Sequence, residues 1–424
     1  MLSLGRALSL SLLVTAASDT APPRLVLRQG LVHSPVPGDA GAISGDGRFV
    51  AVASLARLVN ADVNDVHDIY VLDRKDHTLT LETVTPDGTP SDGSSAHPDL
   101  SDDGQYLVFD SSATNLAHVE DRNGKRDVFL RDRLTGTTTR LGTGTGGLEG
   151  NGSSEGPTIS GDGRIVAFVS SATNLVDGDD ANGVLSDVYL VRVATGLTTR
   201  ASVDANGRQF DKGFAPSLSG DGRFVAFTAI PHAGSDRRRP SAGWSSGASV
   251  HVRDTVSGTI TCISSTGKHR ADAFAPQISD DGLVVFFTVQ NRSDPQRTDI
   301  AVHDRALSVT TVITRHANAR SGAPRPSADG RLVVFESWAS DLLCARRCSE
   351  EDLDANLLPD VYLFDRGAGR FSRLSGARQG WWAPSRAPSI DARGETVVFS
   401  SRQPFGPEDV TVDFDLYVCG PACQ

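Results

Sequence analysis

Acidic and amide side chains recur in one kind of loop at a spacing that suits a calcium ion. The pattern is Asp-x-Asn followed by a further Asp, and it occurs as Asp62, Asn64 and Asp68; Asp121, Asn123 and Asp127; Asp180, Asn182 and Asp187; and Asp354, Asn356 and Asp360. Alternating oxygen ligands in a loop are typical of calcium sites. Asp and Asn side chains also accept hydrogen bonds within their own turns, and the closing Glu of an EF-hand loop is absent. Both interpretations stay open, so no metal or other cofactor is assigned.

A second set of residues suits ligand binding. All four tryptophans lie in or beside the polar loops, and two arginines flank the adjacent pair; the six residues are Trp244, Trp338, Trp381, Trp382, Arg378 and Arg386. Aromatic faces stack on sugar rings or receive apolar side chains, while Arg offers planar donors to carboxylates. We predict these six residues as a binding site for an acidic glycan or a protein segment. The alternative is that each Trp packs against its own loop.

Two motifs resemble catalytic signatures but lack the structural context that such signatures need. Residues 243–247 (GWSSG) match a nucleophile elbow, which requires a strand before it and a helix after it, whereas here a polar loop leads into an apolar strand. Residues 142–147 (GTGTGG) match a dinucleotide fingerprint, yet no helix follows to receive a phosphate. We assign no catalytic residue and expect a binding protein rather than an enzyme.

An enzyme acting on a polysaccharide or a peptide is the alternative function. It would draw its acid and base from loop carboxylates such as Glu350, Glu351 and Asp352. The same acidic run also fits a solvated loop. A calcium-dependent structural surface protein is a third possibility, and the sequence leaves the ligand and the oligomeric state open.

The strands that position these loops belong to a sequence repeat of about 58 residues. An Asp-Gly turn marks each unit, at Asp46, Asp103, Asp162, Asp221, Asp281 and Asp329, with a degenerate seventh copy at Arg393-Gly394. Every turn leads into an unbroken apolar run, which indicates a strand covered on both faces. A further strand then begins at Asp68, Asp127, Asp187, Asp299, Asp360 or Asp415, an Asp expected to fix a turn. Seven such units of four strands predict an all-β, seven-bladed propeller of antiparallel blades.

Closure of the ring is predicted from the two ends of the chain. The last unit stops after a strand around Asp415 to Val418, while Arg24 to Val32 forms a lone strand before the first unit. We predict that this N-terminal strand completes the last blade, which removes an open sheet edge. The propeller domain then covers residues 24–424.

The repeat also resembles a known family. Ser-x-Asp-Gly-Arg-x-x-Ala-Phe at Ser160 to Phe168 and at Ser219 to Phe227, with Asp-Val-Tyr-Leu at Asp187 to Leu190, is similar to the TolB-type, WD-like β-propeller repeat of bacterial exported proteins. The resemblance covers roughly residues 24 to 420. It implies the propeller fold and leaves the function open, because such blades occur both in binding proteins and as propeller domains of peptidases and other enzymes.

The N-terminal segment indicates an exported protein, and the charge balance argues against a nucleic-acid partner. Residues 1–18 combine one Arg, an apolar run and small residues near Ala17, which is typical of a secretory signal peptide. No later stretch approaches the roughly 18 apolar residues of a membrane span. The net charge of −11 disfavours nucleic acid as a partner. We expect a periplasmic or extracellular protein whose partner is a protein or glycan of the cell envelope or exterior.

The five cysteines fit such a compartment. Cys344 and Cys348 are separated by three residues, as are Cys419 and Cys423, so we predict two short-range disulfides. A four-thiolate zinc site and free thiols are the alternatives. Cys262 falls in a predicted strand, where we expect it to be buried as a small apolar residue.

Overall fold

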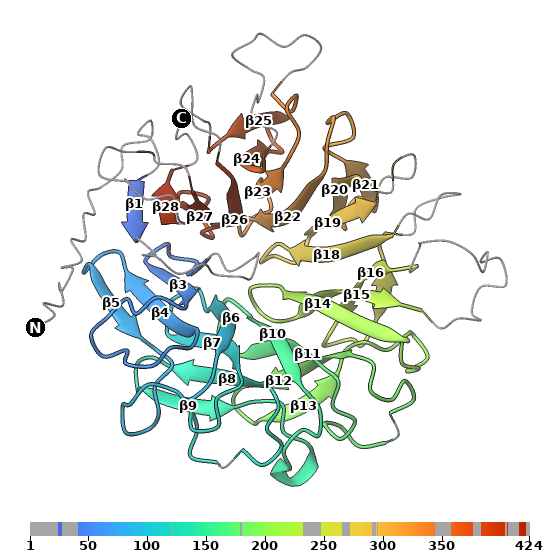
Figure 1. Cartoon of the computed structure of the whole chain (residues 1–424). Coiled ribbons are helices and arrows are strands. Elements are labelled where there is room, and N and C mark those ends of the chain that lie inside the picture. Colours follow the sequence, from blue (N-terminus) through green and yellow to red (C-terminus); the bar gives the residue numbers. More distant parts are fainter. Residues whose placement is uncertain are drawn as a thin grey trace, which may run out of the picture.

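The computed structural model describes residues 24–27, 41–119, 121–178, 180–231, 247–264, 272–290, 294, 296–343, 358–375, 383–402, 405 and 415–420. In this part of the chain the strands form seven four-stranded antiparallel sheets that follow one another around a ring (Figure 1). The predicted seven-bladed β-propeller is therefore confirmed. Among the described residues, no helix has both the length and the apolar character needed to cross a membrane. The predicted signal peptide, residues 1–18, lies outside the described residues.

The blades are numbered I to VII in chain order, and six of them are simple meanders. Their strands are β2 (Ala42–Ile43), β3 (Phe49–Ser54), β4 (Asp68–Asp73) and β5 (Thr78–Leu81) in blade I; β6 (Ser95–Leu100), β7 (Tyr106–Ser111), β8 (Asp127–Asp132) and β9 (Thr137–Arg140) in blade II; β10 (Ser154–Ile159), β11 (Ile165–Ser170), β12 (Asp187–Arg192) and β13 (Leu197–Arg200) in blade III; β14 (Lys212–Leu218), β15 (Phe224–Ile230), β16 (Ser249–Asp254) and β17 (Ile260–Cys262) in blade IV; β18 (Ala273–Ile278), β19 (Val284–Gln290), β20 (Thr298–Asp304) and β21 (Val309–Val312) in blade V; and β22 (Ser321–Pro326), β23 (Leu332–Ser337), β24 (Asp360–Asp365) and β25 (Arg370–Arg373) in blade VI. A short 3-10 turn, Thr145–Gly147, lies between blades II and III.

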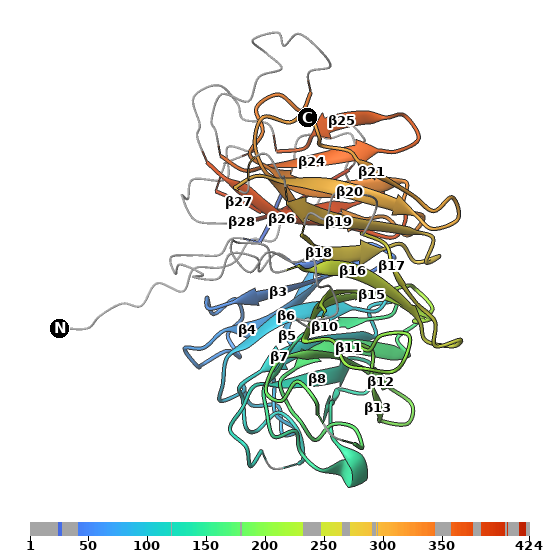
Figure 2. The same cartoon turned by 90° about the vertical axis from the view of Figure 1, so that its right-hand side faces the viewer.

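Blade VII closes the ring. It contains β26 (Ser385–Ile390), β27 (Val397–Ser401), β28 (Asp415–Cys419) and, as its outermost strand, β1 (Arg24–Leu27). β1 pairs antiparallel with β28, with Arg24 opposite Val418 and Leu25 opposite Tyr417. The predicted closure by the N-terminal strand is confirmed for residues 24–27, and residues 28–32 lie outside the described part. Figure 2 shows the N-terminal and C-terminal halves of the chain on opposite sides of the ring.

The middle strands of each blade are buried because neighbouring blades cover both of their faces. All six residues of β4 are buried, whereas β5, the outer strand of the same blade, alternates between exposed and half-buried residues. Aromatic side chains fill the layers between blades, as where the ring of Phe168 stacks on that of Tyr189 at 5.9 Å. Burial on both faces explains why the apolar runs in the sequence do not alternate.

A closed ring of backbone hydrogen bonds links the Asp-Gly turns of all seven blades. In each case an N–H group of one turn donates to a carbonyl oxygen of a neighbouring blade over 2.8 to 3.1 Å: Asp46 to Asp102, Asp102 to Gly161, Asp162 to Gly220, Gly220 to Asp280, Asp280 to Ala328, Ala328 to Ala392, and Ala392 to Gly45. Together with the β1–β28 pairing, these bonds fix the blades relative to one another.

The cysteine predictions have mixed outcomes. Cys262 is exposed, so its predicted burial is wrong. It lies at the end of β17, the outer strand of blade IV, where no further strand covers the edge of the sheet. Cys419 is buried. Cys344, Cys348 and Cys423 lie outside the described residues, so the two disulfides stay predictions.

Candidate functional site

The two ends of the ring differ in their loops. In blades I to VI the first and second strands, and the third and fourth, are joined by tight turns such as residues 44–48 and 74–77. The second and third strands, and the fourth strand and the next blade, are joined by longer loops such as residues 55–67 and 82–94. Because successive strands are antiparallel, the long loops share one end, here called the long-loop face, and the tight turns share the other, the hairpin face. Every sequence-predicted site residue in the described part lies on the long-loop face.

Two of the six predicted ligand-binding residues lie close together. Trp338 directly follows β23, and Arg386 is the second residue of β26 in the next blade. The guanidinium carbon of Arg386 is 5.9 Å from the centre of the Trp338 ring. Trp244, Trp381, Trp382 and Arg378 lie outside the described residues, as do the loop carboxylates Glu350, Glu351 and Asp352 of the enzyme alternative.

Arg320, which the sequence reasoning missed, completes this arrangement. Its guanidinium carbon is 3.9 Å from the centre of the Trp338 ring, a distance typical of a cation–π contact. The backbone N–H of Trp338 donates to the carbonyl oxygen of Arg320 over 3.0 Å. Blades II and III have the same bond between the residues just after the second strand and just before the first strand. An alignment of the repeats would therefore have placed Arg320 opposite Trp338.

Glu336 adds one negative charge to the group. Its Oε1 accepts a hydrogen bond of 2.5 Å from the backbone N–H of Ala387, across the boundary between blades VI and VII. Burial raises the pKa of Glu336, while the Ala387 N–H and the charges of Arg386 and Arg320 act in the opposite direction. We call Arg320, Glu336, Trp338 and Arg386 the rim cluster. Its two guanidinium groups and one carboxylate carry a net positive charge on an acidic protein.

The Asp-x-Asn loops form hydrogen-bonded turns. Asp121 Oδ1 accepts hydrogen bonds from the backbone N–H groups of Asn123, at 3.0 Å, and Gly124, at 2.9 Å. The side-chain amide of Asn123 then donates to the carbonyl oxygen of Gly150 over 2.8 Å, which ties this loop to the loop that leads into the next blade. Equivalent bonds occur from Asn64 to Ser91 and from Asn182 to Phe210. Asp354 and Asn356 lie outside the described residues.

The Asp at the start of the third strand has a recurring hydroxyl partner in several blades. In blade III, Ser202 Oγ donates to Asp187 Oδ1 over 2.6 Å and accepts the backbone N–H of Val188. Thr83, Thr314 and Ser375 donate in the same way in blades I, V and VI. Blade II differs because Gly142 stands at this position, fifteen residues after Asp127. Asp127 therefore lacks the hydroxyl donor that its equivalents have.

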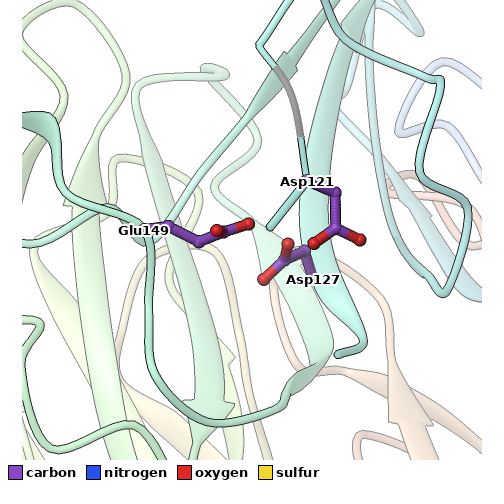
Figure 3. A group of neighbouring side chains, drawn as sticks. All are labelled: Asp121, Asp127 and Glu149. Carbon is purple, nitrogen blue, oxygen red and sulfur yellow. The ribbon is translucent and has the colours of Figure 1, made fainter. Parts of the chain in front are cut away.

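Three carboxylates converge instead in blade II. Figure 3 shows Asp121, Asp127 and Glu149 pointing toward one another, and one oxygen of each lies within 4.8 Å of the others. Among the described residues, this is the one group of three or more His, Cys, Asp or Glu side chains close enough to hold a metal ion. Burial raises the pKa of Asp127 to about 6; nearby Arg140 opposes this shift, and Asp121 and Glu149 add to it. Arg140 Nη1 contacts Glu149 and lies 3.4 Å from Asp127 Oδ2.

The innermost strands carry a third set of polar groups around the propeller axis. Arg325 Nη1 donates to Gln277 Oε1 over 2.9 Å, and Thr158 Oγ1 donates to Asp99 Oδ2 over 2.7 Å. Nearer the hairpin face, burial and the Asp102 carboxylate raise the pKa of Asp280 to about 6. The hydrogen bonds of the first two pairs join adjacent blades, so they help to fix the blades around the axis.

Comparisons with known proteins agree with the fold. No family model and no curated protein sequence matches the chain. Among solved structures, the chain is similar to a putative TolB from Agrobacterium tumefaciens, at 19% identity over 72% of this chain and 87% of that one, with a TM-score of 0.42. It is also similar to oligogalacturonate lyase from Vibrio parahaemolyticus, at 12% identity over 95% and 97% of the two chains, and to the β-propeller domain of the Trilobed protease from Pyrococcus furiosus, at 11% identity over 91% and 96%, both with a TM-score of 0.55. The last two likenesses show a β-propeller fold, and TolB proteins are among the similar structures.

Proposed function

We propose that this protein is an exported binding module that holds a carboxylate-bearing ligand at the rim cluster. The observation that carries the proposal is the contact of the Trp338 ring with the guanidinium groups of both Arg320 and Arg386. Arg320 is exposed, and Trp338 and Arg386 are half-buried, so a ligand on the long-loop face can reach all three. The composition of residues 1–18 supports export.

The chemistry of the rim cluster favours an anion. A guanidinium group that stacks on an aromatic ring keeps its N–H edge available to bind a carboxylate in the plane of the group. Glu336 accepts a backbone hydrogen bond from Ala387, which fixes it beside Arg386. The remaining positive charge must act locally because the net charge of the protein is −11 and salt screens charges beyond about 8 Å.

An acidic glycan fits this arrangement best. Its sugar rings offer apolar faces to tryptophan and its carboxylates suit arginine, and the predicted residues Trp381, Trp382 and Arg378 precede Arg386 in the same connection. An acidic protein segment of the cell envelope or exterior is the second ligand that the same chemistry would accept.

An array of acidic and neutral glycans and envelope proteins tests the proposal. Arg386→Gln should weaken binding of an acidic ligand about tenfold or more, because a charge-assisted contact contributes roughly 1.5 to 3 kcal/mol. Trp338→Ala should also weaken binding, because it removes the ring on which both guanidinium groups pack. Arg164→Gln is the matched control, since Arg164 lies on the hairpin face with 80% of its side chain exposed. Unchanged binding in both rim variants, or equal binding of neutral and acidic glycans, would contradict the proposal. The Trp381→Ala, Trp382→Ala double variant tests whether the rest of the predicted site takes part.

A further inference from the structure

Blades II and III contain the same framework of charged residues with one difference. Each has an Asp in the loop between its second and third strands, an Asp at the start of the third strand, and an Arg at the end of the fourth: Asp121, Asp127 and Arg140 in blade II, and Asp180, Asp187 and Arg200 in blade III. Twenty-two residues after the strand Asp, blade III has Gln209 and blade II has Glu149. The two blades thus provide an internal comparison.

In blade III the amide of Gln209 bridges the two carboxylates. Its Nε2 donates to Asp180 Oδ1 over 2.7 Å and to Asp187 Oδ2 over 2.9 Å. Arg200 lies 3.5 Å from Asp180 and 3.4 Å from Asp187. Two carboxylates and one guanidinium give this group a formal charge of −1, and an N–H donor stands between the two acids.

In blade II the bridging donor is missing. Glu149 replaces the amide with a carboxylate, which has no N–H group to donate. Three carboxylates and one guanidinium, that of Arg140, now give a formal charge of −2. Arg140 neutralises only one of the three negative charges, and an excess of partly buried negative charge is unfavourable. We therefore expect a positively charged group in blade II, at the position that the Gln209 amide occupies in blade III.

Two further observations show that one oxygen of Asp121 lacks a hydrogen-bond donor among the described residues and that Asp127 has fewer donors than its equivalent in blade III. Asp121 Oδ2 is buried and accepts no hydrogen bond from the described residues. Asp127 is 5% exposed, and Gly142 replaces its usual hydroxyl partner. A side chain at position 142 would be difficult to fit, because a Cβ there would lie 2.7 Å from the ring of Phe168.

We propose that Asp121, Asp127 and Glu149 bind a calcium ion between them. All three ligands are oxygen atoms, which hard cations prefer. The carboxylate oxygens lie within 4.8 Å of one another, which two calcium–oxygen bonds of about 2.4 Å can bridge. Calcium accepts several carboxylate ligands in a flexible geometry, whereas magnesium demands a near-octahedral one and keeps several of its waters. The turn that Asp121 Oδ1 forms with Asn123 and Gly124 leaves Oδ2 for the ion.

The site would connect two loops of the long-loop face. Asp121 lies in the loop between β7 and β8, and Glu149 lies in the loop between β9 and β10. Glu149 is already oriented by the backbone N–H of Arg122, at 3.1 Å, and by Arg140. The bound ion would hold these loops together beside blade III.

Isothermal titration calorimetry and thermal melts of the full chain test the site, with calcium, with magnesium and with a chelator. We expect calcium to bind with a stoichiometry of one and to raise the melting temperature in step with the logarithm of its concentration. Glu149→Gln should rebuild the amide bridge of blade III. It should therefore abolish the calcium response and melt above the parent protein in chelator. Glu155→Gln, a change of an exposed carboxylate in β10, is the control and should respond to calcium as the parent does.

The reverse substitution, made in blade III, tests whether a second calcium site can be created. Gln209→Glu should create a second group of three carboxylates and raise the calcium stoichiometry toward two. The proposal is overturned if the parent protein shows no calcium binding in either measurement, or if Glu149→Gln keeps the parent's response. A magnesium response equal to that of calcium would overturn the assignment to calcium.

Discussion

Asp73 and Asp280 are both aspartates toward the hairpin face, and their surroundings shift their pKa values in opposite directions. The side chain of Arg48 donates to Asp73, with Nη2 at 2.6 Å, and lowers the pKa of Asp73 to about 2. Asp280 lies near the propeller axis, where burial and the carboxylate of Asp102 raise its pKa to about 6. A salt-bridged carboxylate stabilises the fold when it is ionised, whereas a desolvated one opposes folding when it is ionised.

The first prediction is that Asp280→Asn stabilises the protein only at neutral and alkaline pH. The folded-state pKa of Asp280 lies above its unfolded value, so the folded state loses stability as the pH rises from about 4 through 6. Removal of the charge should recover about 1 kcal/mol near pH 8, less than the full shift implies because water screens part of the charge, and nothing near pH 4. Denaturant unfolding at both pH values measures this, with the exposed Asp65→Asn as control. A gain of equal size at both pH values would contradict the explanation.

At the residue scale, the sequence predicted which loops carry candidate site residues, but it did not predict all of the side-chain contacts within the site. Trp338 and Arg386 were predicted together because both flank long loops, and they do lie together. Arg320 was missed because a single residue before a strand carries no signal until the repeats are aligned. The difference between Glu149 and Gln209 is harder to detect, because the loops around them vary in length and only the structure shows which acids they approach.

At the scale of the strands, the sequence predicted the number and order of elements but misjudged where some begin. The sequence of blade III places Pro157 near the start of its first strand, where a strand boundary would be expected, yet β10 begins at Ser154. A β-bulge lies between Glu155 and Thr158, and Gly156 there has a φ of 59°. Proline is tolerated at a bulge because the ladder needs no N–H there, so β10 continues through Pro157.

The second prediction concerns β1, the strand contributed by the chain's N-terminal part. A chain that begins after residue 27 should lose several kcal/mol of stability, because blade VII would lose its outer strand and expose the edge of β28. A chain that begins at Pro22 keeps β1 and serves as the control. Thermal and denaturant melts compare the two. Equal midpoints would mean that the β1–β28 pairing contributes little to the closure of the ring.

At the scale of the whole molecule, the Asp-Gly turns join blades as well as strands. The glycine of each turn faces a residue two positions after the turn glycine of the preceding blade; the pairs are Gly47 with Thr396, Gly104 with Phe49, Gly163 with Tyr106, Gly222 with Ile165, Gly282 with Phe224, Gly330 with Val284, and Gly394 with Leu332. The contact between Gly47 and Thr396 joins blade I to blade VII, so these contacts form a complete ring. The repeated glycine in the sequence therefore meets two requirements, a left-handed backbone and a close contact between blades, and only the first can be inferred from a single sequence.

The last prediction separates these two requirements. Gly104 has a φ of 67°, and a Cβ there would lie 2.2 Å from the ring of Phe49; Gly88 has a φ of 85°, and a Cβ there would have nothing within 4 Å. Gly88→Ala should cost about 1 kcal/mol through backbone strain alone. Gly104→Ala should cost about 1 to 3 kcal/mol more, because the new methyl group forces blades I and II apart. Denaturant unfolding measures both. Phe49→Ala should reduce the extra loss in Gly104→Ala and leave the effect of Gly88→Ala unchanged, since only the first pair is in contact. Equal losses at the two glycines would show that the close contact of Gly104 with Phe49 does not restrict position 104.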